Sequence, residues 1–217
     1  MSHAERLEKF DEADLYVVIT QGFCAGRSSI EVLEQVLAAD VKLVQLREKS
    51  LDDKALYEFA KVFREKTSES GALLIIDDRV DVALAVGADG VHLGQMDLPI
   101  SVARNLAPEL IIGASSHSLE EALAAQDAGA SYVNIGPIFE TRTKEVSSGT
   151  VGPDLIDVIR PHLRIPFSVM GGIKLHNIGE VLQRGARHVA VVTAVTEASE
   201  VAIAARELRQ KIEDARR

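Results

Sequence analysis

The chain has 217 residues, of which 47% are hydrophobic and 26% charged, and its formal net charge is −9 at pH 7. This length suits one domain with a full hydrophobic core, and the negative charge argues against a nucleic-acid partner. The single cysteine excludes a disulfide framework and a cysteine zinc site. There is no apolar run of membrane length and no signal-like apolar region behind the charged N-terminus. We therefore expect a cytoplasmic protein without a membrane partner.

Apolar runs alternate with amphipathic segments along the whole chain. Residues 1–12 are predicted to form a short extra helix, and further helices are expected at 30–39, 52–69, 80–86, 119–128, 178–184 and 201–212. Buried strands are expected at 15–20, 43–46, 73–76, 91–93, 111–114, 132–136, 167–170 and 189–193. Strands that alternate with helices form parallel sheets through right-handed crossovers. Eight such units predict that residues 1–217 form a single (β/α)8 TIM barrel of the α/β class.

A weak internal repeat supports this alternation. The segments GADGVHL, GASYVNI and GARHVAV share a Gly-Ala-x-x-Val-x-aliphatic pattern, and they begin at Gly87, Gly129 and Gly185. Each follows a predicted helix. A glycine suits the left-handed residue that ends a helix, and the apolar run after it suits a buried strand.

In a barrel of this kind the functional residues follow the strands. After the second predicted strand comes QLREK, in which strand alternation places Gln45, Arg47 and Lys49 on one side and Leu46 and Glu48 on the other. A glutamine in a buried strand is costly unless something pairs with it. The alternative is a strand end with solvated charges.

Three aspartates follow the third and fourth predicted strands. Asp77 and Asp78 come directly after one strand and Asp97 follows the next. Carboxylates without a nearby His or Cys suit Mg²⁺, which takes one or two carboxylates together with water and phosphate oxygens. The alternative is helix capping, by Asp78 before residue 80 and by Asp97 before residue 100. Asp89 is expected to be a turn residue.

Small hydroxyl residues follow the fifth predicted strand, in GASSHS. Ser118 and Glu121 fit a capping box, so Ser118 is expected to cap the next helix. Ser115 lies nearer to the strand and is the better candidate for binding an anion.

The loops after the sixth and seventh strands offer donors for phosphate. The long loop GPIFETRTKEVSSGTVG carries Thr141, Thr143 and Lys144 and has the length of a binding lid; the alternative is a disordered excursion. The tandem glycines Gly171 and Gly172 let backbone N–H groups approach an anion. Loops after strands seven and eight are the usual phosphate site of this barrel.

The histidines and the cysteine give weaker indications. The six histidines show no metal-ligand spacing. His92 and His117 lie near the predicted mouth of the barrel, where we expect them to be packed and hydrogen-bonded. Cys24 in GFCAG is expected to pack inertly.

The residues together indicate a transfer reaction. Carboxylates, cations and hydroxyls are present, but strong bases and nucleophiles are few, so the site is expected to stabilise a bound or departing phosphate group. Two separate anion sites fit two small-molecule substrates, one carrying a diphosphate and the other a monophosphate.

QLREK, DDRVDVALAVGADGVHLGQMD, GPIFETRTK, GGI and VVTAV occur in this order and together resemble the thiamine-phosphate synthase family over nearly the whole chain. The resemblance implies a TIM-barrel transferase that joins a pyrimidine diphosphate to a thiazole phosphate, which can be carboxylated. Diphosphate would leave first, and the thiazole nitrogen would then attack. It also implies a Mg²⁺ cofactor held by Asp78 and Asp97.

The resemblance also implies roles for the remaining motif residues. Catalytic roles would fall to Arg47, Lys49, Ser115 and Lys144. The substrate-binding set would be Gln45, Leu46, Arg47, Glu48, Lys49, Asp77, Ser115, Thr141, Arg142, Thr143, Lys144, Gly171, Gly172, Val192 and Thr193.

The chain departs from the family pattern at two positions. The family usually has Asn in place of Asp77, and an ionised carboxylate can only accept hydrogen bonds; the alternative is that Asp77 contacts the metal. Met96 stands where an acidic residue is common. Two rival functions stay open, an isomerase of the carboxythiazole phosphate that uses His117 and a non-catalytic phosphate-ligand sensor. Self-association into a homo-oligomer also stays open.

Overall fold

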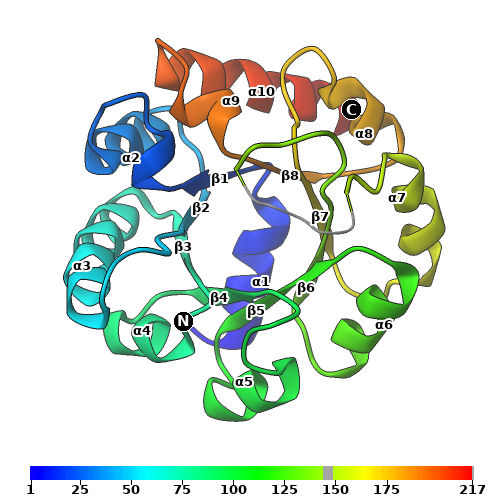
Figure 1. The fold of residues 1–217 in the computed structure, drawn as a ribbon, viewed down its shortest axis with the longest axis horizontal. Helices are drawn as coiled ribbons and strands as arrows, with labels where there is room; N and C mark the ends of the chain where they lie inside the picture. Colours follow the sequence, from blue (N-terminus) through cyan, green and yellow to red (C-terminus); the bar gives the residue numbers. More distant parts are fainter. Residues whose placement is uncertain (144–148, 217) are drawn as a thin grey trace.

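The computed structural model describes residues 1–143 and 149–216. Eight parallel strands close into a barrel in the order β1 to β8, and helices form a ring around it (Figure 1). The strands are β1 (Leu15–Ile19), β2 (Leu43–Leu46), β3 (Leu73–Asp77), β4 (Gly90–Leu93), β5 (Ile111–Ser116), β6 (Tyr132–Ile135), β7 (Phe167–Met170) and β8 (His188–Val191). The predicted TIM-barrel fold is confirmed.

Helices α2 to α8 connect successive strands on the outside of the barrel, whereas α1 precedes the first strand and α9 and α10 follow the last. They are α1 (His3–Glu12), α2 (Ser29–Ala38), α3 (Asp53–Ser70), α4 (Val80–Val86), α5 (Ile100–Leu106), α6 (Leu119–Asp127), α7 (Asp154–Ile159), α8 (Ile178–Gln183), α9 (Thr193–Thr196) and α10 (Val201–Arg216), with 3-10 turns η1 (Gln21–Phe23) and η2 (Arg160–His162). The sequence prediction missed α7 and α9. They have six and four residues, too few to establish a helical period.

The Gly-Ala repeat marks the same structural step three times. Gly87, Gly129 and Gly185 have φ angles of 66°, 96° and 85°, the left-handed region that favours glycine. Each lies between a helix and the next strand, as the sequence predicted.

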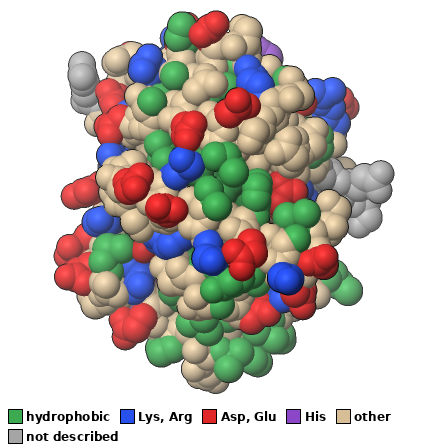
Figure 2. Space-filling view, turned by 90° about the vertical axis from the view of Figure 1, so that its left-hand side faces the viewer, with side chains coloured by type: hydrophobic (Ala, Val, Ile, Leu, Met, Phe, Trp, Pro, Cys, Tyr) green, Lys and Arg blue, Asp and Glu red, His purple; other side chains and the backbone are tan. Residues whose placement is uncertain are grey.

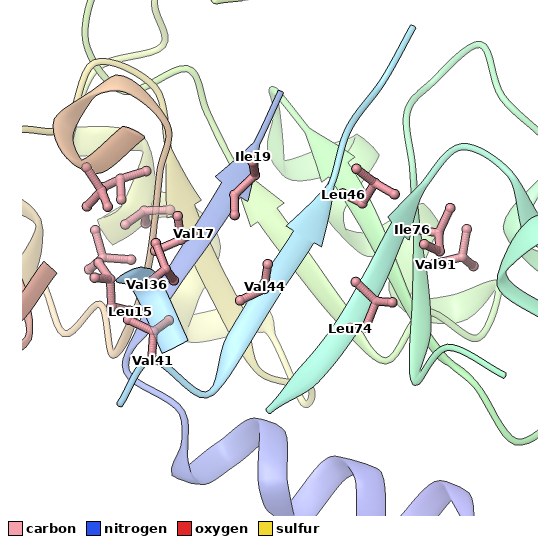
Figure 3. Packing of buried hydrophobic residues seen from close by; sticks show 14 of the residues in the cluster. Leu15, Val17, Ile19, Val36, Val41, Val44, Leu46, Leu74, Ile76 and Val91 are labelled. Atoms are coloured by element: carbon pink, nitrogen blue, oxygen red, sulfur yellow. The ribbon is translucent and has the colours of Figure 1, made fainter. Parts of the chain in front are cut away.

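Two hydrophobic cores lie on opposite faces of the barrel wall. The larger one fills the layer between strands and helices, where Val17, Val44, Leu74 and Val91 point outward from four neighbouring strands (Figure 3). Aliphatic and alanine side chains dominate this layer, as expected for parallel strands covered by helices. The smaller core fills the barrel interior and consists of Phe10, Ala13, Tyr16, Val18, Leu43, Leu73, Ile75, Ile111, Tyr132 and Ala190.

Helix α1 closes the N-terminal end of the barrel, and Figure 1 shows it crossing the centre of the ring. Ser2 and Glu5 form a capping box that starts this helix. Near its other end, the fully buried Phe10 stacks on Tyr132, with ring centroids 4.6 Å apart. The helix therefore seals the interior core from solvent on the side opposite the strand C-termini.

The molecular surface carries charges of both signs. On the face shown in Figure 2, acidic and basic side chains are interspersed with apolar ones and form no large patch of one sign. Across residues 1–143 and 149–216, no helix combines the length and hydropathy needed to cross a membrane.

Candidate active site

The candidate site lies at the C-terminal ends of the strands, where two pockets adjoin. A pocket of about 360 Å³ is lined by Gln45, Arg47, Lys49, Asp77, Asp78, His92, Gly94, Gln95, Met96, Asp97, Ser115, His117 and Met170. A second of about 600 Å³ is lined by residues 140–143, 170–174 and 190–194 and by Glu197. A space of about 50 Å³ between Ser115 and Thr141 lies against both. Below, the pocket of about 360 Å³ is called the carboxylate pocket and the pocket of about 600 Å³ is called the glycine pocket.

Cations and carboxylates share the carboxylate pocket. The Lys49 Nζ lies 3.0 Å from Asp77 Oδ2 and also pairs with Asp78, while the Arg47 Nε lies 3.4 Å from Asp77 Oδ2. Asp77 Oδ2 is buried and makes no hydrogen bond of good geometry, so these contacts are ion pairs rather than well-formed hydrogen bonds. Attraction to the carboxylates raises the pKa of Lys49, although its burial acts in the opposite direction.

Asp78 and Asp97 approach each other and cap no helix. The N-cap residues of α4 and α5 are Arg79 and Pro99, and neither helix has a side-chain cap, so the capping alternative is wrong. Asp97 Oδ2 instead accepts from the Gly94 N–H at 2.6 Å. Burial, then the charge of Asp77, and a hydrogen bond with Asp97 raise the pKa of Asp78 to about 6.

Strand alternation at the end of β2 places its side chains as predicted. Gln45 lies inside the barrel, where its Nε2 donates to the Tyr16 hydroxyl at 2.7 Å. Leu46 packs in the outer core, and Glu48 accepts from the Gln21 N–H at 2.5 Å. Leu46 and Glu48 therefore point away from the carboxylate pocket, and we drop them as substrate contacts.

Ser115 lies at the junction of the two pockets. Its hydroxyl is 3.0 Å from His92 Nε2, and its carbonyl accepts from Gln95 Nε2 at 2.6 Å. Ser118 caps α6 as predicted, but Glu121 bonds the backbone N–H and the ring of His117 rather than closing the box on Ser118.

Glycines shape one wall of the glycine pocket. Gly171 and Gly172 have φ angles of 106° and 63°, and a Cβ on either would lie within 2.5 Å of the loop after β6. Only glycine fits both the backbone conformation and the contact. Thr141 and Thr143 face this wall, and their hydroxyls are 3.0 Å apart.

The glycine pocket also contains a cation that the sequence prediction missed. Lys174 follows the tandem glycines, and its Nζ donates to Thr193 Oγ1 at 2.6 Å. Burial lowers the pKa of Lys174, and the charge of nearby Arg142 lowers it further. Val192 and Thr193 line the same pocket, and Arg142 pairs with Glu197. The signal for Lys174 was its place in MGGIK, directly after the glycine turn.

Two remaining predictions concern Lys144 and Cys24. Lys144 lies outside the described residues. Cys24 is buried and donates to the Thr20 carbonyl at 3.3 Å, and burial raises the pKa of its thiol to about 11. A thiol in this environment is a packing group, as predicted.

The carboxylate pocket fits Mg²⁺ better than a softer metal. In the described part of the chain, no group of three or more His, Cys, Asp or Glu side chains is arranged to hold a metal. Asp78 and Asp97 supply two carboxylates, and the charge of Asp77 adds to burial in raising the pKa of Asp78. Mg²⁺ takes such a pair when water and phosphate oxygens complete its shell.

The fold and the site together define a TIM-barrel enzyme with two polar pockets at the strand C-termini. Residues 15–195 match the family model described as thiamine monophosphate synthase. The chain therefore belongs to the thiamine monophosphate synthase family, and its predicted class, a transferase of thiamine biosynthesis, is confirmed.

Individual relatives agree with the family model along most of the chain. The thiamine-phosphate synthase of Chloroflexus aurantiacus is 45% identical over 195 residues, which are 90% of each chain. That of Pelotomaculum thermopropionicum is 43% identical over 199 residues and 91% of each chain. The solved structure of thiamine phosphate pyrophosphorylase from Pyrococcus furiosus is 40% identical, with a TM-score of 0.88 over 94% of this chain and 98% of that one.

Proposed function

We propose that the chain condenses 4-amino-2-methyl-5-(diphosphooxymethyl)pyrimidine with a thiazole phosphate to give thiamine phosphate and diphosphate. The observation that supports this most directly is the pair of adjoining pockets with different donors. One holds two cations beside three carboxylates, and the other combines a glycine wall with threonines and Lys174. Two pockets joined by a small space beside Ser115 suit a reaction between two phosphorylated substrates.

The carboxylate pocket would take the diphosphate. Arg47 and Lys49 would move from Asp77 onto the phosphate oxygens and stabilise the negative charge that develops as diphosphate leaves. Asp78 and Asp97 would hold Mg²⁺, which neutralises diphosphate charge when bound. Ser115 would donate to an oxygen of the leaving group.

The glycine pocket would take the thiazole phosphate. Lys174 supplies a positive charge, and the Thr141, Thr143 and Thr193 hydroxyls supply donors. The thiazole ring would then point toward Ser115 and the neighbouring pocket.

The bond changes balance without a base from the protein. The C–O bond between the pyrimidine methylene and the diphosphate breaks, and its electron pair leaves with the diphosphate. The amino group of the pyrimidine stabilises the resulting cation, and the lone pair of the thiazole nitrogen forms the new C–N bond. A site rich in phosphate ligands and poor in strong bases suits this dissociative sequence.

One assay separates this function from its rivals. The purified chain is incubated with both substrates and Mg²⁺, and thiamine phosphate and diphosphate are quantified. We expect equal amounts of the two products. Absence of product would refute the proposal: isomerised thiazole alone would indicate the isomerase, in which His117 at the mouth is the candidate group, and binding without turnover would indicate a sensor.

A variant pair tests the metal site. Asp78→Ala should abolish Mg²⁺-dependent turnover while the circular dichroism spectrum stays that of the folded protein. Asp81→Ala is the matched control, because Asp81 is exposed on α4 and pairs only at the surface with Arg79. Normal activity of Asp78→Ala would remove this carboxylate from the proposed metal site.

A further inference from the structure

A continuous chain of hydrogen bonds crosses the barrel interior from β2 to the mouth. Gln45 Nε2 is 2.7 Å from the Tyr16 hydroxyl, which is 3.1 Å from the Tyr132 hydroxyl. The Tyr132 hydroxyl is 2.9 Å from His92 Nδ1, and His92 Nε2 is 3.0 Å from Ser115 Oγ. All five side chains are buried, and the most exposed, Ser115, is 8% exposed.

One direction of donation, which starts at the Gln45 amide, gives every hydroxyl and ring nitrogen of this chain a partner. An amide NH₂ group can only donate, so the Tyr16 oxygen accepts from Gln45 and passes its own proton toward Tyr132. In this direction Tyr132 donates to His92 Nδ1. With Nδ1 as the acceptor, the neutral ring carries its proton on Nε2 and donates to Ser115 Oγ. The proton of the Ser115 hydroxyl is left to point into the mouth.

We propose that Tyr132 and His92 are positioning residues that hold the Ser115 hydroxyl as a hydrogen-bond donor toward an anionic oxygen in the carboxylate pocket. This inference rests on the proposed function, in which that oxygen belongs to the departing diphosphate. A serine with its proton turned inward would present only lone pairs to the same oxygen and would repel it. The direction of the chain is therefore part of how the site recognises an anion.

Packing fixes the central member of this chain. The ring of Phe10, on α1 at the N-terminal end of the barrel, stacks on the ring of Tyr132. On the neighbouring strand its register partner is Gly113, where a Cβ would lie 2.2 Å from the tyrosine ring. The ring fits only because residue 113 is glycine. Its hydroxyl is thus held between Tyr16 and His92.

Burial keeps both tyrosines available as donors. It raises the pKa of Tyr16 and of Tyr132 well above the ordinary value for a phenol, so both keep their protons at any working pH. Helix α1 seals the N-terminal end of the barrel and so keeps water out of the interior. In such an interior, successive hydrogen bonds polarise one another.

The tautomer of His92 tests the direction of the chain without any enzyme assay. In ¹⁵N-histidine-labelled full-length protein, nitrogen NMR distinguishes a ring protonated on Nε2 from one protonated on Nδ1. The His92 signals are identified by their loss in His92→Gln. We expect a neutral ring with the proton on Nε2 at pH 8. A proton on Nδ1, or on both nitrogens, would overturn the inference.

A double-mutant cycle tests whether Tyr132 acts through Ser115. Tyr132→Phe removes the donor but keeps the ring on Phe10, and it should weaken binding of inorganic diphosphate in the presence of Mg²⁺ about tenfold by calorimetry. In a Ser115→Ala background the same change should have no further effect. Tyr57→Phe is the matched control: Tyr57 lies on α3, outside this chain of hydrogen bonds, so the His92 tautomer and the affinity should remain.

The outcomes separate this inference from the proposed function. Additive effects of Tyr132→Phe and Ser115→Ala would refute the positioning role, even if the protein makes thiamine phosphate. Coupled effects together with the Nε2 tautomer would support it, even if the product assay failed. In the active enzyme, Tyr132→Phe should raise KM for the diphosphate substrate and leave KM for the thiazole phosphate unchanged.

Discussion

The buried histidine at the closed end of the barrel should make stability depend on pH. His188 begins β8, is 3% exposed and donates from Nδ1 to the Ala13 carbonyl at 2.9 Å. Its ring lies 4.7 Å from that of Phe10. Burial lowers the pKa of His188 from 6.5 to about 4, and the charge of Arg216 contributes in the same direction.

The sign and size of the effect follow from this shift. Below pH 6.5 the unfolded chain binds a proton at this histidine, whereas the folded protein does not until about pH 4. The contribution of His188 to the free energy of unfolding is therefore fully present above pH 6.5 and is lost as the pH falls toward 4. The loss amounts to about 2 kcal/mol at pH 5 and reaches about 3 kcal/mol below pH 4.

Urea unfolding followed by far-ultraviolet circular dichroism measures this loss. The free energy of unfolding is determined at pH 7.5 and at pH 5 for the wild type and for His188→Asn, whose amide can still donate to Ala13 but does not titrate. The wild type should lose about 2 kcal/mol more than the variant between the two values. His162→Asn, at an exposed position, is the control and should behave as the wild type. An equal loss in the wild type and in His188→Asn would refute the reasoning.

Three further changes test other parts of the molecule. Asp77→Asn should strengthen binding of inorganic diphosphate with Mg²⁺ roughly fivefold by calorimetry, about 1 kcal/mol, because Lys49 loses a competing carboxylate. Lys174→Met should weaken binding of the thiazole phosphate about tenfold and leave diphosphate binding unchanged, since its Nζ lies in the glycine pocket. Asp89→Ala should lower the free energy of unfolding in urea by about 3–5 kcal/mol, because it removes the acceptor for Arg64 Nη1 at 2.6 Å and for the Leu74 N–H at 2.9 Å.

Each of these expectations has a contrary result. Weaker diphosphate binding by Asp77→Asn would mean that Asp77 contacts the metal or the substrate rather than competing for cations. A loss of diphosphate binding in Lys174→Met would mean that the two pockets do not act separately. A change below 1 kcal/mol in Asp89→Ala would return this residue to the turn role that the sequence suggested.

The barrel could be predicted because its signals are local. Each strand is a short apolar run, each long helix has its own apolar period, and three glycines mark the step from helix to strand. The carboxylate pocket followed from topology, because parallel strands bring Arg47, Asp78 and Asp97 to one end of the barrel. For such features, the position of a residue in the sequence decides where it lies in the fold.

The interior network could not be predicted in this way. Tyr16 and Tyr132 come from strands that are far apart in sequence, and their hydroxyls meet only because the barrel closes. One signal was present: Gly113 lies within a strand, where glycine marks a close approach by another group. The ion pair between Asp89 and Arg64 was not predicted for the same reason. Arg64 comes from α3, and no residue next to Asp89 in the sequence indicates the contact.

The charges at the mouth bear on how an acidic protein would take the two anions of the proposed function. The carboxylate pocket sets Asp77, Asp78 and Asp97 against Arg47 and Lys49, so carboxylates outnumber cations there. A diphosphate alone would add to this negative excess, and a divalent cation alone would face the Lys49 ammonium between two carboxylates. If the cation and the diphosphate enter together, Lys49 can turn to the phosphate while the carboxylates keep the metal. In the proposed function the same residues would thus favour joint binding of Mg²⁺ and diphosphate, in which each raises the affinity for the other by the same factor.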